Sequence, residues 1–281
     1  MAELVRVASD VSSALEGRRP VVAFETTLIA HGFPEGRGAE VAREATERIR
    51  AAGAVPAVVG IVDGVVRVGL EDDELDRFAA SPDARRVGPR DLAPCIISGE
   101  LGATTVGGTL AVCRAVGVGF LATGGIGGVH RGYGSRLDVS ADLFELAATS
   151  EVLETLGIPV LGWQTDTLPL FYSADGGPPV SQRVETADEA AQLARLHWSL
   201  VRHSAILLAR PPSESLDVEP LVARVIEAAE HEGVRGTRLT PFLLGRLHAE
   251  SEGATVELNA RLVAENSALA AEVAVAYARL H

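Results

Sequence analysis

The sequence predicts a layered α/β fold with a central sheet, because two hydrophobic patterns alternate along the chain. Short β-branched or aliphatic runs bounded by Gly, Pro or charged residues are typical of buried strands, and helical patterns lie between them. The chain has 281 residues, of which 47% are hydrophobic, so it can bury a sizeable core. No linker, low-complexity stretch or fixed-period repeat interrupts the pattern. We therefore expect a single domain over residues 1–281.

The elements follow in order. The first 17 residues predict an amphipathic helix. Buried strands are predicted at residues 21–25, 57–64, 119–125, 158–163 and 205–210. Several of the intervening helices open on a capping residue and close on Gly. The predicted helices span residues 35–53, 104–117, 186–203, 219–233 and 254–280.

Composition narrows the class of function. The net charge is −13 and no basic run occurs, which argues against a nucleic acid or an anionic membrane surface as partner and favours a small-molecule substrate. The chain has neither a signal-peptide pattern nor an apolar stretch of membrane-spanning length, so we expect a cytoplasmic protein. Cys95 and Cys113 form no CxxC motif, and we expect core or interface thiols.

Lysine does not occur in the sequence. All 25 residues counted as Lys or Arg are arginine. A guanidinium group stays protonated in proteins and cannot act as an amine nucleophile. Covalent chemistry through a lysine amine therefore has no residue to carry it within this chain.

A glutamate closes the first predicted strand. The stretch FETTLIAHGFP, residues 24–34, places Glu25 at the carboxyl end of that strand, where ligands collect in open α/β sheets. The carboxylate is either a general acid or base or a helix cap. Catalysis is favoured because no helix start is evident before residue 35.

A glycine-rich segment holds the second candidate. TGGIGGVHRG, residues 123–132, packs five glycines beside His130 after a strand. Such bare backbone allows positive φ angles or the close approach of a ligand, which favours a phosphate or sugar cradle over a surface turn. His130 is a candidate base or ligand, although a single His is more often structural.

Two shorter stretches resemble anion sites. ARRVGPRDL, residues 84–92, predicts a basic loop, and GATTVGGTL, residues 102–110, joins two threonines to a helix start. Hydroxyls and free N–H groups at a helix N-terminus suit a phosphate, which makes Thr105 a substrate-binding candidate. An ordinary Thr N-cap explains the second stretch equally well.

The segment DVSAD, residues 138–142, offers two carboxylates and a hydroxyl. Asp138 and Asp142 with Ser140 suit a hard divalent cation, whose usual ligands are carboxylate oxygens and water. The alternative is a helix N-cap, with Asp142 placed well for the helix dipole.

Taken together, these motifs resemble the pseudouridine-5′-phosphate glycosidase family, also called the indigoidine synthase A-like family. The resemblance runs from about residue 10 to residue 280 and is carried by FETTLIAHGFP, RVGPRDL, GATTVGGTL, ATGGIGGVHRG, DVSADLFEL and TRLTPFLLGRL. It implies an α/β/α layered fold with a central mixed sheet, a homotrimer, and cleavage or formation of a C–C bond between a uracil-like base and C1′ of ribose 5-phosphate. Mn²⁺ or another divalent cation is implied as well.

The resemblance also implies residue roles. Glu25 falls on the proton donor that opens the ribose ring, His130 lies beside the base, and Asp138 falls on the aspartate that binds the metal through waters. The substrate-contacting positions fall on Val106, Ser140, Ala141, Asp142 and Asn259. These assignments are carried over from the family motifs.

The sequence departs from the family pattern in two places. Arg86 stands where family members have a lysine, and an arginine can still bind phosphate. The segment that carries the family's Schiff-base lysine is missing, because FELAATS joins EVLETLGIPV directly near residue 150. Three explanations stay open: an omitted segment, a relative with altered chemistry such as a C-glycosynthase that joins ribose 5-phosphate to an aromatic acceptor, or a ribose-phosphate-binding pseudoenzyme. A nucleotide-binding dehydrogenase is disfavoured, because no acidic residue follows the glycine loop at the expected distance.

Overall fold

The computed structural model describes residues 4–34, 36–125, 157–169, 177–201, 204–216, 219–234 and 239–280. A seven-stranded mixed sheet occupies the N-terminal half, and its strands are β1 (Val5–Val7), β2 (Val21–Glu25), β3 (Val55–Val62), β4 (Val65–Val68), β5 (Arg85–Val87), β6 (Gly102–Thr104) and β7 (Phe120–Ala122). A second, parallel sheet contains β8 (Val160–Trp163), β9 (Gln182–Val184) and β10 (Leu207–Ala209). The expected α/β fold with a central mixed sheet is confirmed.

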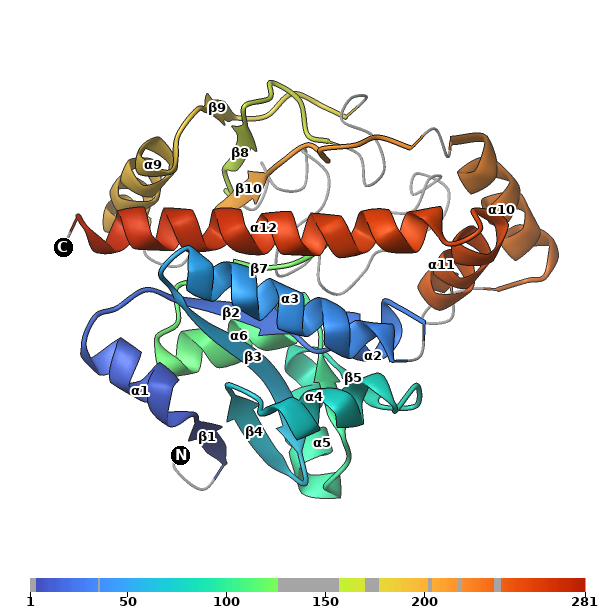
Figure 1. The fold of residues 1–281 in the computed structure, drawn as a ribbon, viewed down its shortest axis with the longest axis horizontal. Coiled ribbons are helices and arrows are strands. Elements are labelled where there is room, and N and C mark those ends of the chain that lie inside the picture. The colour runs from blue at the N-terminus through green and yellow to red at the C-terminus, as the bar shows by residue number, and fades with distance from the viewer. Residues whose placement is uncertain are drawn as a thin grey trace.

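Helices cover both faces of the larger sheet. In its half of the chain these are α1 (Ser9–Glu16), α2 (Thr27–His31), α3 (Arg37–Ala51), α4 (Asp72–Ala79), α5 (Leu92–Ser98) and α6 (Val106–Val116), with a short 3₁₀ turn at Pro89–Asp91. The C-terminal half adds α9 (Ala187–Leu200), α10 (Glu219–His231), α11 (Leu239–Glu250) and α12 (Ala254–Ala278). In Figure 1, α12 crosses the molecule between the two sheets. It packs against α3, α9, β2 and β7.

The alternation of side chains in β2 builds two cores. Val22 and Phe24 face a cluster that includes residues of α3 and α12, whereas Val21 and Ala23 face one that includes residues of α1 and α6. All five residues of β2 are buried, as expected for a central strand covered on both sides. The larger sheet is therefore the middle of three layers.

Three predicted segments differ in the structure. The N-terminal stretch is not one helix, because β1 precedes α1 and pairs with β4. The stretch after Glu25 does start a helix before residue 35, namely α2, so the reason given for preferring catalysis at Glu25 was wrong. Residues 84–92 are not a basic loop, because β5 and the 3₁₀ turn form there and pairing with β6 fixes the strand.

The two cysteines behave as expected. Both are free and buried, and both belong to the core cluster on the α1 and α6 side of the sheet. Burial raises the pKa of Cys113 to about 12. None of the helices in the described part of the chain combines the length and hydropathy that a membrane crossing demands.

Candidate active site

Glu25 is a buried carboxylate at the carboxyl end of β2. Its side chain is 3% exposed. The parallel register pairs Phe24 of β2 with Ala122 of β7, so the next residues along the two strands, Glu25 and Thr123, are neighbours. The Thr123 hydroxyl donates a hydrogen bond of 2.6 Å to Glu25 Oε1. The two strand ends thus hold the carboxylate in a fixed place.

Buried threonines tie β6 to the end of β2. The Thr26 and Thr104 hydroxyls both donate to the Val59 carbonyl, at 2.9 and 2.7 Å, and the Thr104 N–H donates to Thr26 Oγ1 at 2.8 Å. Thr104 Oγ1 also lies 2.9 Å from the hydroxyl of Thr109 in α6. Because Thr26, Thr104 and Thr109 are all fully buried, this network fixes the position of the strand ends that surround Glu25.

We expect Thr104→Val to lower the free energy of unfolding by about 1–3 kcal/mol, because the isosteric change leaves buried polar neighbours unsatisfied. Chemical denaturation measures the effect. Thr46→Val is the control, since the Thr46 hydroxyl donates to the Arg43 carbonyl and accepts a long 3.5 Å hydrogen bond from Arg50, both within its own helix, and we expect a smaller loss. Equal losses would show that the buried network adds no stability of its own.

The start of α6 lies beside this network. Thr105 caps the helix, and its side-chain oxygen accepts a hydrogen bond of 3.2 Å from the Gly108 N–H. The capping interpretation of this stretch is therefore confirmed, and substrate binding by Thr105 stays a prediction. Val106 is the first helical residue and is buried. Gly108 allows α6 to approach β5, since a Cβ there would lie 2.2 Å from the Val87 carbonyl oxygen.

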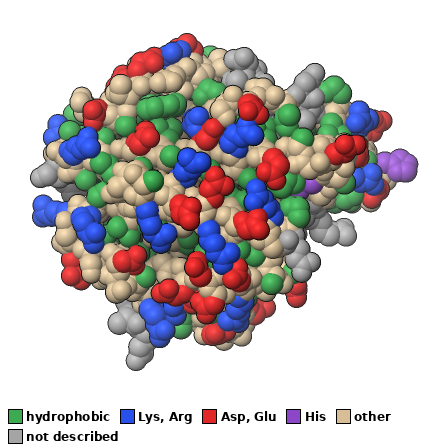
Figure 2. All heavy atoms as spheres, viewed as in Figure 1, with side chains coloured by type: hydrophobic (Ala, Val, Ile, Leu, Met, Phe, Trp, Pro, Cys, Tyr) green, Lys and Arg blue, Asp and Glu red, His purple; other side chains and the backbone are tan. Residues whose placement is uncertain are grey.

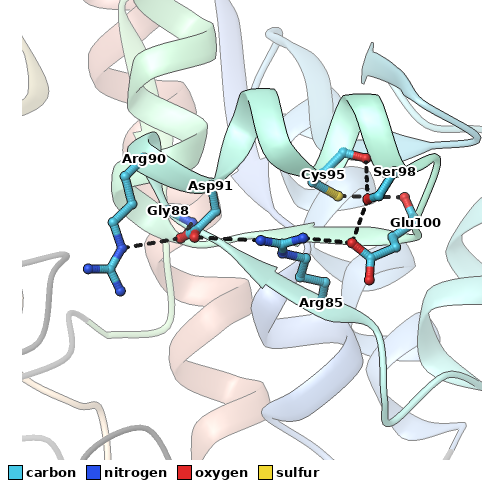
Figure 3. Close-up of polar contacts among 7 residues, drawn as sticks. All are labelled: Arg85, Gly88, Arg90, Asp91, Cys95, Ser98 and Glu100. Carbon is cyan, nitrogen blue, oxygen red and sulfur yellow. Dashed lines mark hydrogen bonds and ion pairs between the residues drawn. The ribbon is translucent and has the colours of Figure 1, made fainter.

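The β5 strand carries two successive arginines, Arg85 and Arg86. Arg85 pairs with Glu100 at 2.7 Å and lies 3.9 Å from Asp91 (Figure 3). Asp91 also accepts a 3.2 Å hydrogen bond from the Gly88 N–H, which fixes the turn after the strand. Because successive strand residues point to opposite faces, Arg86 is directed away from these ion pairs.

His31 lies close enough to Arg86 for the guanidinium charge to lower the pKa of the imidazole, and sequence reasoning did not select it as a site residue. It ends α2, and its ring donates a hydrogen bond to the Ala84 carbonyl. Its Nε2 is buried without a partner among the described residues. Burial, and secondarily the positive charge of Arg86, lower the pKa of His31 to about 4. The imidazole is therefore neutral at pH 7.

This shift predicts a pH dependence of stability. Between about pH 6.5 and pH 4 the unfolded chain takes up a proton at His31 and the native protein does not, so the free energy of unfolding falls as the pH is lowered through that window. Above pH 6.5 the group contributes no slope. Urea unfolding at several pH values should show a shallower decline for His31→Asn than for the wild type.

His248→Asn provides the comparison for this experiment. Burial also lowers the pKa of His248, so this variant removes a decline of the same sign from a site far from Arg86 in sequence. If the free energy of unfolding falls equally with pH in His31→Asn and in the wild type, the neutral state of His31 does not cause the loss of stability in acid.

Two asparagines of α12 face the turn after β7. Asn266 Nδ2 donates a 2.9 Å hydrogen bond to the Thr123 carbonyl. A Cβ on Gly124 would lie 2.6 Å from Val263 Cγ2 and 3.1 Å from Asn259 Oδ1. Asn259 is 2% exposed, and its Oδ1 has no hydrogen-bond partner among the described residues. The structure thus places Asn259 next to the turn that contacts Glu25.

Five predicted site residues lie outside the described residues. They are His130, Asp138, Ser140, Ala141 and Asp142. Within the described ranges, no group of three or more His, Cys, Asp or Glu side chains is placed to hold a metal ion. The metal prediction at Asp138 therefore stays a prediction.

A groove of about 620 Å³ lies along the side of α12 that faces away from the turn after β7. Much of its charged lining is paired, for example Arg37 with Glu257 and Arg210 with Glu265. Figure 2 shows Arg and acidic side chains interspersed over this face. Glu25 does not line the groove, which separates it from the candidate active site.

The geometry around Glu25 suits proton transfer next to an anionic ligand. It offers a buried carboxylate, a hydroxyl that hydrogen-bonds it, a capped helix start and the nearby strand that carries Arg86. General acid or base catalysis needs a carboxyl group held in this way. Phosphate groups prefer helix N-termini and arginine forks.

Comparisons with known proteins find relatives along nearly the whole chain. A Streptomyces griseus protein named pseudouridine-5′-phosphate glycosidase is 40% identical over 97% of this chain and 92% of its own. A Chloroflexus aurantiacus protein of the same name is 41% identical over 99% of this chain and all of its own length. The alignment with the Streptomyces protein spans 296 positions, of which this chain fills about 273, that is, 97% of 281.

Two solved structures share the fold. The prealnumycin C-glycosynthase AlnA in complex with ribulose 5-phosphate is 33% identical, with a TM-score of 0.89 over 99% of this chain and 98% of its own. An indigoidine synthase A-like protein from Thermotoga maritima is 33% identical, with a TM-score of 0.86 over 97% of this chain and 96% of its own.

The family profile described as Indigoidine synthase A like protein matches residues 10–150 and 144–276, in two parts that overlap at residues 144–150. Together the two parts cover nearly the whole chain. Pseudouridine-5′-phosphate glycosidases and a C-glycosynthase are similar to this chain over 97–99% of its length. The chain therefore belongs to the indigoidine synthase A-like family.

Proposed function

We propose that this protein cleaves or forms the C–C bond between C1′ of ribose 5-phosphate and a carbon of a uracil-like base. The observation that carries the proposal is the buried Glu25 carboxylate at the end of β2, hydrogen-bonded by Thr123. The names of the similar glycosidases supply the reaction class, and the sugar phosphate bound to AlnA supports the ligand class.

The proposal gives the described residues distinct tasks. Glu25 exchanges a proton with the ribose ring oxygen. Arg86 binds the phosphate, for which its planar fork is suited. Val106 and Asn259 line the substrate, as the family motifs imply, and Thr105 does so because a hydroxyl at a helix start suits a phosphate. The roles of His130, Ser140, Ala141 and Asp142 rest on the sequence and its family motifs, because these residues lie outside the described part of the chain.

The proposed cation site is at Asp138, with Mn²⁺ or another divalent ion keeping several of its waters. We expect Asp138→Asn to weaken the dependence of activity on added Mn²⁺ and to leave thermal unfolding nearly unchanged. Loss of folding without a change in metal dependence would support a helix cap instead. A homotrimer is proposed on the same family resemblance, and sedimentation of the purified chain tests it.

A second candidate function is a ribose-phosphate-binding protein without the family's covalent chemistry. Three observations favour it: the sequence contains no lysine, the family profile matches in two parts that overlap at residues 144–150, and about 23 positions of the alignment with the Streptomyces relative have no counterpart here. A C-glycosynthase that acts on another acceptor is compatible with the same observations.

The deciding experiment uses the purified chain with Mn²⁺. Pseudouridine 5′-phosphate is supplied in one reaction, and uracil with ribose 5-phosphate in another, each beside a Glu25→Ala control. Calorimetry with ribose 5-phosphate runs in parallel, and an intact mass tests for an additional segment. Turnover above the control supports the glycosidase function, and tight binding without turnover supports the binding protein. If the protein neither binds ribose 5-phosphate nor turns over either substrate, both candidate functions are overturned.

A further inference from the structure

We propose that Thr123 is the positioning residue of Glu25, and that its hydroxyl turns to serve both protonation states of the carboxyl group. The inference rests on the proposed function, because it concerns the group that would exchange the proton. It stands on the hydrogen bonds of the turn that follows β7, where Thr123, Gly124 and Gly125 lie.

The hydroxyl of Thr123 has one proton and two acceptors. Glu25 Oε1 lies at 2.6 Å and the Gly125 carbonyl oxygen at 3.0 Å. The Gly125 N–H in turn donates to Thr123 Oγ1 at 3.2 Å. The distance to Glu25 is that of an O–H donor to a charged carboxylate oxygen.

Both protonation states can be satisfied by this arrangement. When Glu25 is ionised, the hydroxyl donates its proton to Oε1. When Glu25 is protonated, the carboxylic acid donates to Oγ1 and the hydroxyl turns its own proton to the Gly125 carbonyl. A hydroxyl accepts two hydrogen bonds and donates one, so the contact with Glu25 is kept in both states, while the hydroxyl proton moves between Glu25 Oε1 and the Gly125 carbonyl.

The turn holds this hydroxyl in place from the other side. Asn266 fixes the Thr123 carbonyl, and Val263 and Asn259 leave no room for a side chain on Gly124. The position of Oγ1 is therefore set by β7 and α12 together, and the carboxylate is oriented by rigid elements.

The turn that follows β8 has the same local hydrogen bonds as the turn at Thr123, without a contact to a carboxylate in the described part of the chain. After β8, the Thr165 hydroxyl donates to the Thr167 carbonyl at 3.0 Å and accepts from the Thr167 N–H at 3.3 Å. This is the same local pattern as Thr123 makes with Gly125. No carboxylate bonds the Thr165 hydroxyl among the hydrogen bonds of the described residues. Thr165 therefore provides a matched control for the turn itself.

The test compares Thr123→Val, Thr123→Ser and Thr165→Val in the cleavage and synthesis reactions described above. We expect Thr123→Val to lower kcat roughly tenfold to a hundredfold with little change in KM, the scale expected for one charge-assisted hydrogen bond. Thr123→Ser keeps the hydroxyl and should restore kcat to within about threefold. Thr165→Val should change thermal stability without this loss of kcat.

A substrate-free measurement accompanies the kinetics. Thermal unfolding of Thr123→Val, Glu25→Ala and the double variant should show shifts in Tm that are not additive, because both substitutions remove the same hydrogen bond. Additive shifts overturn the proposed contact. If Ser fails to rescue Val, or if KM alone changes, the positioning role is overturned while the proposed function stands. A wild-type protein that neither binds ribose 5-phosphate nor turns over either substrate overturns the proposed function itself, and the role of Thr123 with it.

Discussion

Replacing Glu25 with glutamine is expected to lower turnover of pseudouridine 5′-phosphate by about 10²–10⁴-fold, the usual contribution of a general acid or base. The amide keeps the size of the side chain and an oxygen that accepts from Thr123, but it carries no exchangeable acid proton. Because Glu25 is 3% exposed, bulk water cannot easily replace it as the proton source. Initial rates of uracil release measure the effect.

Glu74→Gln is the matched control. This carboxylate is 12% exposed and pairs with Arg67 at 3.2 Å, away from the strand ends that surround Glu25. Its loss should reduce thermal stability and leave the rate largely unchanged. If Glu25→Gln keeps more than a tenth of the wild-type rate, another group transfers the proton.

Borohydride reduction in the presence of ribose 5-phosphate is expected to trap no covalent adduct inside the chain. An imine requires a primary amine, and all 25 of the Lys and Arg residues are arginine. Arginine remains charged and cannot attack C1′, so the N-terminal α-amino group is the sole primary amine encoded in this sequence. Intact mass followed by peptide mapping detects and locates any adduct.

A family member that carries the lysine segment is the positive control for this reduction and should gain the mass of the reduced sugar phosphate. An adduct mapped to an internal peptide of this protein would show that the chain does contain an internal primary amine that forms an imine. Turnover without an adduct would instead show that the C–C bond is handled through proton transfer without a covalent stage.

The sequence predicted the long, strongly patterned elements well. The expected strand at 21–25 coincides with β2, and the helices expected at 35–53 and 254–280 contain α3 and α12. Their patterns are long enough to outweigh local noise. The strands β5 and β6 were missed because each is only three residues long and is stabilised by its partner strand.

The candidate site was predicted in part. Glu25 could be found because it follows an apolar strand, and the resemblance pointed to Arg86 and Asn259. His31 gave no signal, since a lone His near a helix end is common and its lowered pKa depends on burial and on Arg86, which is distant in sequence. Thr123 is the first residue of the glycine-rich segment, but its contact with Glu25 was not predicted. Only the pairing of β2 with β7 shows that the two residues are neighbours.

The position of α12 has a consequence for how the chain folds during synthesis. The core beside β2 contains Val256, Ala260, Val263, Ala271 and Ala274 of this last helix, next to residues of α3. Until α12 has emerged from the ribosome, that face of the sheet has no cover, and the apolar surface of β2 and α3 is open to chaperones or to other chains. Contacts this distant in sequence also slow folding. Truncation before residue 254 should therefore yield an aggregating chain even though every strand of the larger sheet is present.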